Sequence, residues 1–163
     1  MGKQGFSIIE LMVTVVIMGV LAAVAVPKLF GFFDKTKASE ISLAAGTYIK
    51  LQDLYVYEHH KTGNWHDIGY KSPAGNSLGR ASTSTFAYEA SQAQYNWSAE
   101  ALISLNKCAK GSKWFINFHY DGGQQVSYWA SSEDETNCKN ALTPNFSKIG
   151  NTTTPITTPG GKE

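Results

Sequence analysis

The chain has 163 residues, enough for one modest domain beside a separate N-terminal segment. Its formal net charge is +1 and the charges are well mixed, which argues against a basic nucleic-acid surface and against an acidic tail for a cationic partner. The slightly negative mean hydropathy averages two unlike parts, an intensely apolar N-terminus and a polar remainder rich in Gly, Ser, Thr and Asn.

The N-terminus consists of a short segment, Met1–Gly5, and an apolar run, Phe6–Val26, in which Glu10 is the one charged residue. As a helix, the 21 residues of this run would span ~30 Å, the thickness of a hydrocarbon core. A carboxylate at the bilayer centre costs at least ~2.5–3.5 kcal/mol, so such a residue usually has a partner and a function. The run therefore predicts a membrane-spanning helix with a functional acid near one end.

Helical periodicity continues past Pro27, so the apolar run and an amphipathic helix from Leu29 to about residue 58 are expected to form one rod. This continuity argues against an ordinary signal peptide, for which Ala22–Ala25 resembles a cleavage site. The Gly63-Asn64 pair is expected to end the helix.

One face of the amphipathic helix is expected to pack on a sheet. The residues predicted on that face are Phe33, Ile41, Ala45, Tyr48, Leu51 or Gln52, and Tyr55. Near the membrane end, Phe30, Phe32 and Phe33 are expected to contact a partner helix instead.

The remainder predicts a small β-rich head. Residues Trp65 to about Ser82 are rich in Gly, Ser and Asn and predict a loop. Strands are predicted at Thr83–Tyr88 and Tyr95–Trp97, and a short helix or strand at Ala99–Leu105. The clearest element is a hairpin, in which Lys113–Tyr120 and Gln124–Ala130 flank an Asp-Gly-Gly turn. Residues 151–163 predict a loose tail.

The two cysteines, Cys108 and Cys138, lie far from the apolar run. In a chain whose bulk lies outside the cytoplasm, a lone pair favours one disulfide, and two unpaired thiols in a cytosolic domain are the alternative. Their spacing fits no Cys-x-x-Cys redox or zinc signature.

Three other groups of residues are of the types found in ligand sites. His59, His60, His66 and Asp67 are interpreted as solvated residues rather than zinc ligands, and Glu133–Glu135 as a solvated acidic turn rather than a calcium site. Trp65 and Trp97 are the tryptophans expected to be free for stacking on sugar rings, while Trp114 and Trp129 are assigned to the core. Neither catalysis nor a cofactor nor a metal is predicted.

The segment Gly5-Phe6-Ser7-Ile8-Ile9-Glu10-Leu11, followed by Gly19-Val-Leu-Ala-Ala-Val-Ala-Val-Pro27, resembles the N-terminus of type IV pilins and type II secretion pseudopilins. The resemblance implies that a prepilin peptidase cuts after Gly5 and methylates the new N-terminus at Phe6. It also implies that Glu10 is the acid used in assembly, and that Gly19 and Pro27 are the residues that interrupt the helix.

The chemistry of these residues fits these roles. A carboxylate at Glu10 can pair with the Phe6 ammonium of a neighbouring subunit, so that each charge offsets the burial cost of the other. Pro27 removes a helical hydrogen bond, and together with Gly19 it makes the intervening stretch easier to unwind in a filament. A simple kink at Pro27 is the alternative.

These observations predict an α+β fold in which a long N-terminal helix packs on a small antiparallel β-sheet. The expected parts are a leader (1–5), a transmembrane and assembly helix (6–27), a periplasmic or extracellular head (28–150) and the tail (151–163). The expected function is a structural pilus subunit, inserted in the inner membrane, processed, and polymerised with other pilins by the assembly machinery into an extracellular pilus for adhesion or motility. A pseudopilin and a membrane-anchored polysaccharide-binding module are the alternatives, and no nucleic-acid partner is predicted.

Overall fold

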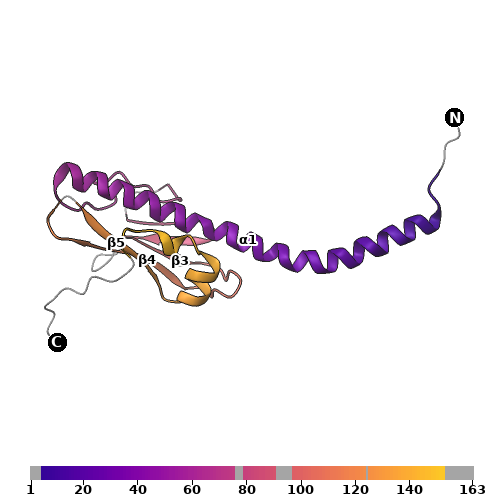
Figure 1. Cartoon of the computed structure of the whole chain (residues 1–163). Helices are drawn as coiled ribbons and strands as arrows, with labels where there is room; N and C mark the ends of the chain where they lie inside the picture. Colours follow the sequence, from indigo (N-terminus) through magenta and orange to yellow (C-terminus); the bar gives the residue numbers. More distant parts are fainter. Residues whose placement is uncertain (1–4, 76–78, 91–96, 124, 153–163) are drawn as a thin grey trace.

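The computed structural model describes residues 5–75, 79–90, 97–123 and 125–152. It confirms the α+β architecture: one long helix, α1 (Ile8–His59), lies with its second half against a five-stranded antiparallel sheet, while its first half projects away from the head (Figure 1). The expected leader residues 1–4, the Tyr95 end of one expected strand and the tail from residue 153 lie outside the described residues.

Helix α1 is continuous across Gly19 and Pro27. Its ribbon is curved along the projecting half (Figure 1), and an interior proline is a common cause of such bending because it removes one backbone hydrogen bond. In the single chain, therefore, the Gly19–Pro27 stretch remains helical.

The C-terminal end of α1 corrects the expectation for Gly63-Asn64. The helix ends at His59, and His60 adopts the left-handed conformation (φ 52°) with its N–H donating to the Val56 carbonyl. Gly63 is needed for close packing instead, because a Cβ there would lie 2.8 Å from Ile68 Cγ2. The amide of buried Gln52 lies against the Gly63 backbone, with oxygen–nitrogen distances of 2.9 and 3.0 Å, and so fixes this turn.

The sheet runs in sequence order from β1 to β5, with every neighbouring pair antiparallel. The strands are β1 (Arg80–Ser82), β2 (Phe86–Glu89), β3 (Trp97–Ala101), β4 (Lys113–Tyr120) and β5 (Val126–Ser132). The predicted hairpin is confirmed as β4 and β5, with Phe118 opposite Tyr128. Strand β1 lies at the end of the segment that was expected to be a loop, so that part of the expectation is wrong.

The core lies between α1 and one face of the sheet. Ile41, Ala45 and Tyr48 are fully buried as predicted, and Gln52 rather than Leu51 occupies the next buried position. Phe33 is 59 % exposed, so its assignment to the core face is wrong: it lies on the projecting half of the helix. The sheet contributes the buried aromatic residues Phe86, Tyr88, Trp97, Trp114 and Tyr128.

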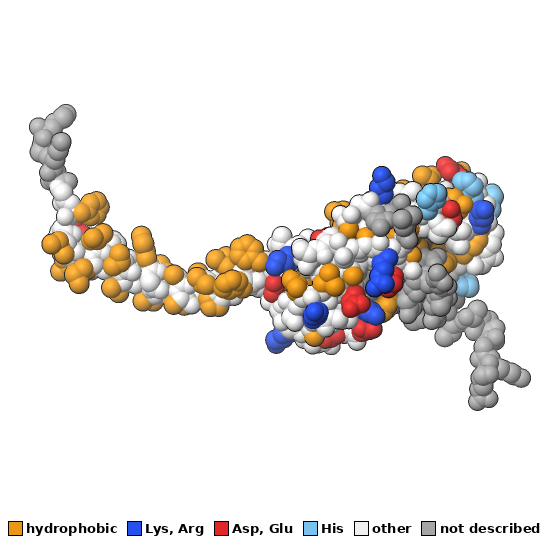
Figure 2. All heavy atoms as spheres, turned by 180° about the vertical axis from the view of Figure 1, so that it is seen from behind, with side chains coloured by type: hydrophobic (Ala, Val, Ile, Leu, Met, Phe, Trp, Pro, Cys, Tyr) orange, Lys and Arg blue, Asp and Glu red, His pale blue; other side chains and the backbone are white. Residues whose placement is uncertain are grey.

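Two short helical segments, η1 (Glu135–Leu142) and η2 (Phe146–Lys148), follow the sheet. In the space-filling view (Figure 2), hydrophobic side chains cover the projecting rod, whereas charged side chains are spread over the head. The described part of the chain therefore consists of a folded head and an uncovered apolar rod.

Candidate functional site

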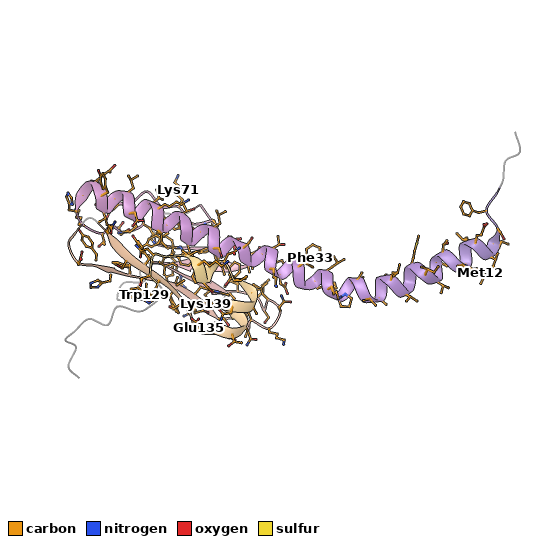
Figure 3. All side chains as sticks on the ribbon, in the orientation of Figure 1. Met12, Phe33, Lys71, Trp129, Glu135 and Lys139 are labelled. Carbon is orange, nitrogen blue, oxygen red and sulfur yellow. A yellow bond between two sulfur atoms is a disulfide. The ribbon has the colours of Figure 1, made fainter. Side chains whose placement is uncertain are left out.

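The projecting half of α1 is the candidate functional site because its apolar surface is uncovered. Its large apolar side chains remain largely exposed from Phe6, at 87 %, to Phe33. Val26, the least exposed of those large apolar side chains, is still 46 % exposed. Figure 3 shows Met12 and Phe33 pointing away from the rod without reaching the head. Since burying one such side chain is worth about 1.5–3 kcal/mol, this surface requires a membrane or other protein chains around it. Helix α1 is long and apolar enough to cross a membrane.

Glu10 lies at the first turn of α1, where its carboxylate accepts a hydrogen bond from the Ser7 backbone N–H (2.9 Å). Ser7 is the N-cap residue and Glu10 is three residues further on, the spacing of a capping box. A negative charge at a helix N-terminus is also stabilised by the helix dipole. The acid therefore has a partner within its own chain, and that partner lies next to Phe6.

Gly5 and Phe6 precede the helix in a non-helical segment, and both are exposed. A Cβ at Gly5 would meet nothing within 4 Å, so the fold of the single chain does not demand glycine there. The same holds for Gly19 within the helix. Any need for the small side chain at these two positions must come from a partner that approaches the rod.

The head contacts the rod through the loop that contains Asn106. The Asn106 backbone N–H donates to Asp34 Oδ2 (2.8 Å), and its side-chain amide lies 3.4 Å from the Gly31 carbonyl oxygen. Asn106 has a positive φ of 53°, which asparagine tolerates better than most residues. This junction is not predicted by the sequence patterns, although the isolated Asn106 between Leu105 and Lys107 is a signal for a tight turn.

The predicted disulfide between Cys108 and Cys138 is confirmed, with the two Cα atoms 4.9 Å apart. It joins the Asn106 loop to η1. The buried Trp114 indole lies beside this bridge and donates to the Thr143 hydroxyl (3.0 Å), which in turn donates to the Cys138 carbonyl (3.1 Å). These bonds hold the loop, η1 and the sheet together.

The acidic turn beside the disulfide uses its carboxylates within the fold. Asp134 caps η1 by accepting from the Asn137 backbone N–H (2.8 Å), and this bond holds the pKa of Asp134 below its usual range. Glu135 pairs with Lys139 at 2.7 Å, and Figure 3 shows both side chains on η1. No group of three His, Cys, Asp or Glu side chains suited to a metal ion occurs in the described ranges.

The interpretation of the tryptophans needs correction. Trp65 and Trp97, expected to be free, are 1 % and 0 % exposed, because Trp65 packs edge-on against Tyr70 and Trp97 Nε1 donates to the Tyr70 hydroxyl (2.9 Å). Burial raises the pKa of Tyr70 to about 12. Trp114 is buried as predicted, whereas Trp129 is only partly buried. His59, His60 and His66 are exposed, and the His59 ring stacks on Tyr55.

Comparison with known proteins agrees with the geometry of the rod. Residues 1–26 match a family model described as a prokaryotic N-terminal methylation motif. The chain is 32 % identical to the type IV major pilin protein PilA of Myxococcus xanthus over 78 residues, 47 % of this chain and 36 % of that protein. It is 44 % identical to the type IV major fimbrial protein FimA of Dichelobacter nodosus over 52 residues, 31 % of this chain and 32 % of that protein.

A longer match, at 30 % identity over 111 residues, is to a fimbrial protein of Dichelobacter nodosus and covers 65 % of this chain and 63 % of that protein. The chain thus spans about a third of the length of the first two relatives and under two thirds of the third. No solved structure matches it significantly. The resemblance to type IV pilins is confirmed.

Proposed function

We propose that this chain, which carries the N-terminal methylation motif and is similar to type IV pilins, is a structural subunit of a type IV pilus filament. Its precursor is inserted in the inner membrane through residues 6–27, with the head on the outer side. Cleavage after Gly5 and methylation of Phe6 by a prepilin peptidase precede polymerisation with other pilin subunits into an extracellular pilus. The role is structural rather than enzymatic, and the assembly machinery is the expected partner.

The observation that supports this proposal best is the uncovered rod itself. A domain merely anchored in a membrane needs an apolar helix, in which an acid could serve only to cap the helix. Here Glu10 lies in the first turn of the apolar helix, three residues after the Ser7 N-cap, and the peptide bond expected to be cut lies in an exposed segment just before that cap. Both charges needed for pairing between subunits thus lie at one end of the rod.

Assembly gives Glu10 a second partner. After cleavage, Phe6 carries a free ammonium group, and a carboxylate of a neighbouring subunit neutralises it when the two rods are staggered correctly. Since an unpaired charge buried between helices is costly, this pairing favours one register over others. The Ser7 hydrogen bond keeps the carboxylate accommodated before a neighbour arrives. Gly19 and Pro27 are proposed to let the intervening turns unwind in the packed filament.

Replacing Glu10 by Ala tests the proposal. We expect Glu10→Ala to abolish or sharply reduce filament formation, because loss of one member of a fully buried pair costs about 3–5 kcal/mol, and less at the membrane edge, in every subunit of the polymer. The measurement is the yield of sheared filaments relative to total membrane-bound subunit. Intact mass shows whether the subunit still begins at a methylated Phe6.

Glu58→Ala is the matched control, because Glu58 is an exposed acid on the same helix within the head. It is expected to leave filament yield unchanged. Wild-type yield from Glu10→Ala, with normal processing, would contradict the register role and favour a plain membrane anchor. A wild-type filament subunit that retains Lys3, or that begins after Ala25, would contradict the proposed processing.

A further inference from the structure

We propose that the turn between β4 and β5 contains a site of spontaneous covalent modification, at which Asp121 is converted to isoaspartate through its bond to Gly122. The only co-reactant is water. The product is linked to Gly122 through its side-chain carbon, and its free main-chain carboxylate is the group that isoaspartate-specific methyltransferases methylate with S-adenosylmethionine. This modification belongs to the folded head and does not depend on the proposed pilus function.

The reaction joins two atoms of neighbouring residues. The Gly122 amide nitrogen attacks Cγ of the protonated Asp121 carboxyl group, the nitrogen loses its proton, and one water leaves as a succinimide ring closes. Water then adds back to the ring. Breaking the bond between nitrogen and Cγ restores aspartate, whereas breaking the bond between nitrogen and the main-chain carbonyl carbon gives isoaspartate. One water is lost and one is gained, so the mass of the chain is unchanged.

The sequence singles out Asp121 among the aspartates. The nitrogen of the following residue is the nucleophile, so a side chain on that residue hinders the attack. Asp121 is the one aspartate followed by glycine, and the chain has no Asn-Gly pair. The other aspartates, Asp34, Asp53, Asp67 and Asp134, are followed by Lys, Leu, Ile and Glu. The least hindered nucleophile therefore lies in the β4–β5 turn.

The turn also holds the reacting groups together. The Gly123 backbone N–H donates to Asp121 Oδ1 (3.0 Å), so the carboxyl group folds back over the peptide bond that contains the Gly122 nitrogen. A Cβ at Gly123 would lie only 4.0 Å from Asp121 Cγ. The same N–H withdraws electron density from the carboxyl group and makes Cγ a better electrophile. All three residues are exposed, so water reaches them.

The Gly122 nitrogen is open to reaction. A Cβ at Gly122 would meet nothing within 4 Å, so no neighbouring side chain shields this position. Within the described ranges, no hydrogen bond engages the Gly122 N–H. The nitrogen therefore gives up neither a hydrogen bond nor a packing contact when it attacks.

Asp67 provides the comparison within the same head. It too is exposed and lies in a turn, where its Oδ2 accepts from the Asn64 N–H (3.2 Å). The nitrogen that follows it belongs to Ile68, which is 7 % exposed, and that nitrogen donates to the Asn64 carbonyl (3.1 Å). Attack by this nitrogen would break a hydrogen bond and move a buried, β-branched residue. Asp67 is therefore expected to remain aspartate.

Isoaspartate would change the turn without touching the rod. It adds one methylene group to the main chain and removes the acceptor of the Gly123 N–H, which weakens the contact in which the Tyr120 hydroxyl donates to the Gly123 carbonyl (2.8 Å). Gln125, just after the turn, and Tyr57, near the end of α1, line the same recess. The turn thus lies at the end of the head remote from the rod (Figure 1).

Prepared side by side, the full-length wild type and two variants, Asp121→Glu and Asp67→Glu, test the proposal. Glutamate would have to close a larger ring, which forms far more slowly. Each protein is kept folded in detergent at mildly acidic pH for several weeks. Isoaspartate is then counted by the transfer of labelled methyl groups from S-adenosylmethionine by an isoaspartate-specific methyltransferase. It is located by electron-transfer fragmentation of the tryptic peptides 62–71 and 114–139, which contain Asp67 and Asp121.

We expect methyl incorporation to rise with time in the wild type and equally in Asp67→Glu, to stay at background in Asp121→Glu, and to map to Asp121. Isoaspartate at Asp67 or Asp134 in place of Asp121, or none in the aged wild type, would overturn the proposal. A wild-type sample unfolded in denaturant is aged in parallel. Modification of Asp121 in that sample alone would show that the folded turn protects the bond, which would also overturn it.

Discussion

Two carboxylates on α1, both exposed, have different neighbours. Glu10 lies at the exposed start of the helix, where the Ser7 N–H stabilises its charge. Asp53 lies where α1 contacts β5, beside a recess lined by Leu54, Tyr57 and Val126. Desolvation raises the pKa of Asp53, and the nearby Tyr128 hydroxyl partly opposes that rise. Burial, together with the nearby Asp53 charge, raises the pKa of Tyr128 as well.

The environment of Asp53 predicts a pH-dependent stability. Because its pKa is higher in the folded than in the unfolded chain, the folded state loses stability as the pH rises from the ordinary value of 3.8 through the folded pKa. Asp53→Asn removes this loss while keeping a side chain of the same size and shape. We expect the variant to unfold at a higher denaturant concentration than wild type at pH 7 and at the same concentration at pH 3. An equal gain at both pH values would point to packing rather than ionisation.

At the scale of elements, the free edge of β5 is closed by the segment that follows η2. The Asn151 side chain accepts from the Tyr128 N–H (2.8 Å) and donates to the Val126 carbonyl (2.7 Å), while Gly150 bridges to Trp129. Gly150 has φ of 113°, and a Cβ there would lie 2.5 Å from the Tyr128 carbonyl oxygen. Glycine and asparagine are thus both required for this edge.

Removal of the Asn151 side chain tests the edge closure. Asn151→Ala leaves one donor and one acceptor of β5 without their partner, and we expect it to lower the free energy of unfolding by ~1–3 kcal/mol. Asn145→Ala is the control, because Asn145 is exposed and its side chain makes no capping bond to η2. Chemical denaturation of both variants measures the difference, and equal stability would contradict a role for Asn151.

The elements that the sequence predicted correctly are those with local signals. The β4–β5 hairpin has alternating apolar residues and a glycine turn, and the Ile41, Ala45 and Tyr48 stripe has helical spacing. Strand β1 was missed because three residues carry almost no pattern and pair only with β2. Burial of Trp97 was missed because its hydrogen-bond partner, Tyr70, lies 27 residues away.

The same distinction applies to the candidate site. The motif around Glu10 is local, so it was found, whereas the contact between Asn106 and Asp34 spans 72 residues and leaves no periodic signal. The end of the helix was misplaced because His60, rather than a glycine, adopts the left-handed conformation. Gly63 instead packs against Ile68 and Tyr55, a contact that only the folded chain reveals.

On the scale of the whole molecule, one loop connects the rod to the C-terminal helical segment of the head. Asn106 contacts α1 at Gly31 and Asp34, and two residues later Cys108 is bonded to Cys138 in η1. The Leu105 and Cys108 backbones exchange hydrogen bonds of 2.9 Å, so the loop is itself tightly folded. The disulfide therefore restrains the loop that determines where the head ends and the rod begins.

This arrangement predicts two separable effects of removing the disulfide. The cysteines are 30 residues apart, and closing a loop of that size is worth ~3.5–4 kcal/mol in the chain-entropy model. We expect a Cys108→Ser, Cys138→Ser double variant to lose about that much stability. We also expect faster hydrogen exchange at the Asn106 amide, because its bond to Asp34 depends on a loop that the disulfide no longer restrains.

Asp34→Ala, the matched control, should speed exchange at the same amide while costing only ~0.5–1.5 kcal/mol of stability. Unchanged exchange in the double variant would mean that the hydrogen bonds of the loop suffice to hold the head on the rod. Equal stability losses in the double variant and in Asp34→Ala would mean that the disulfide acts mainly through the contact between Asn106 and Asp34.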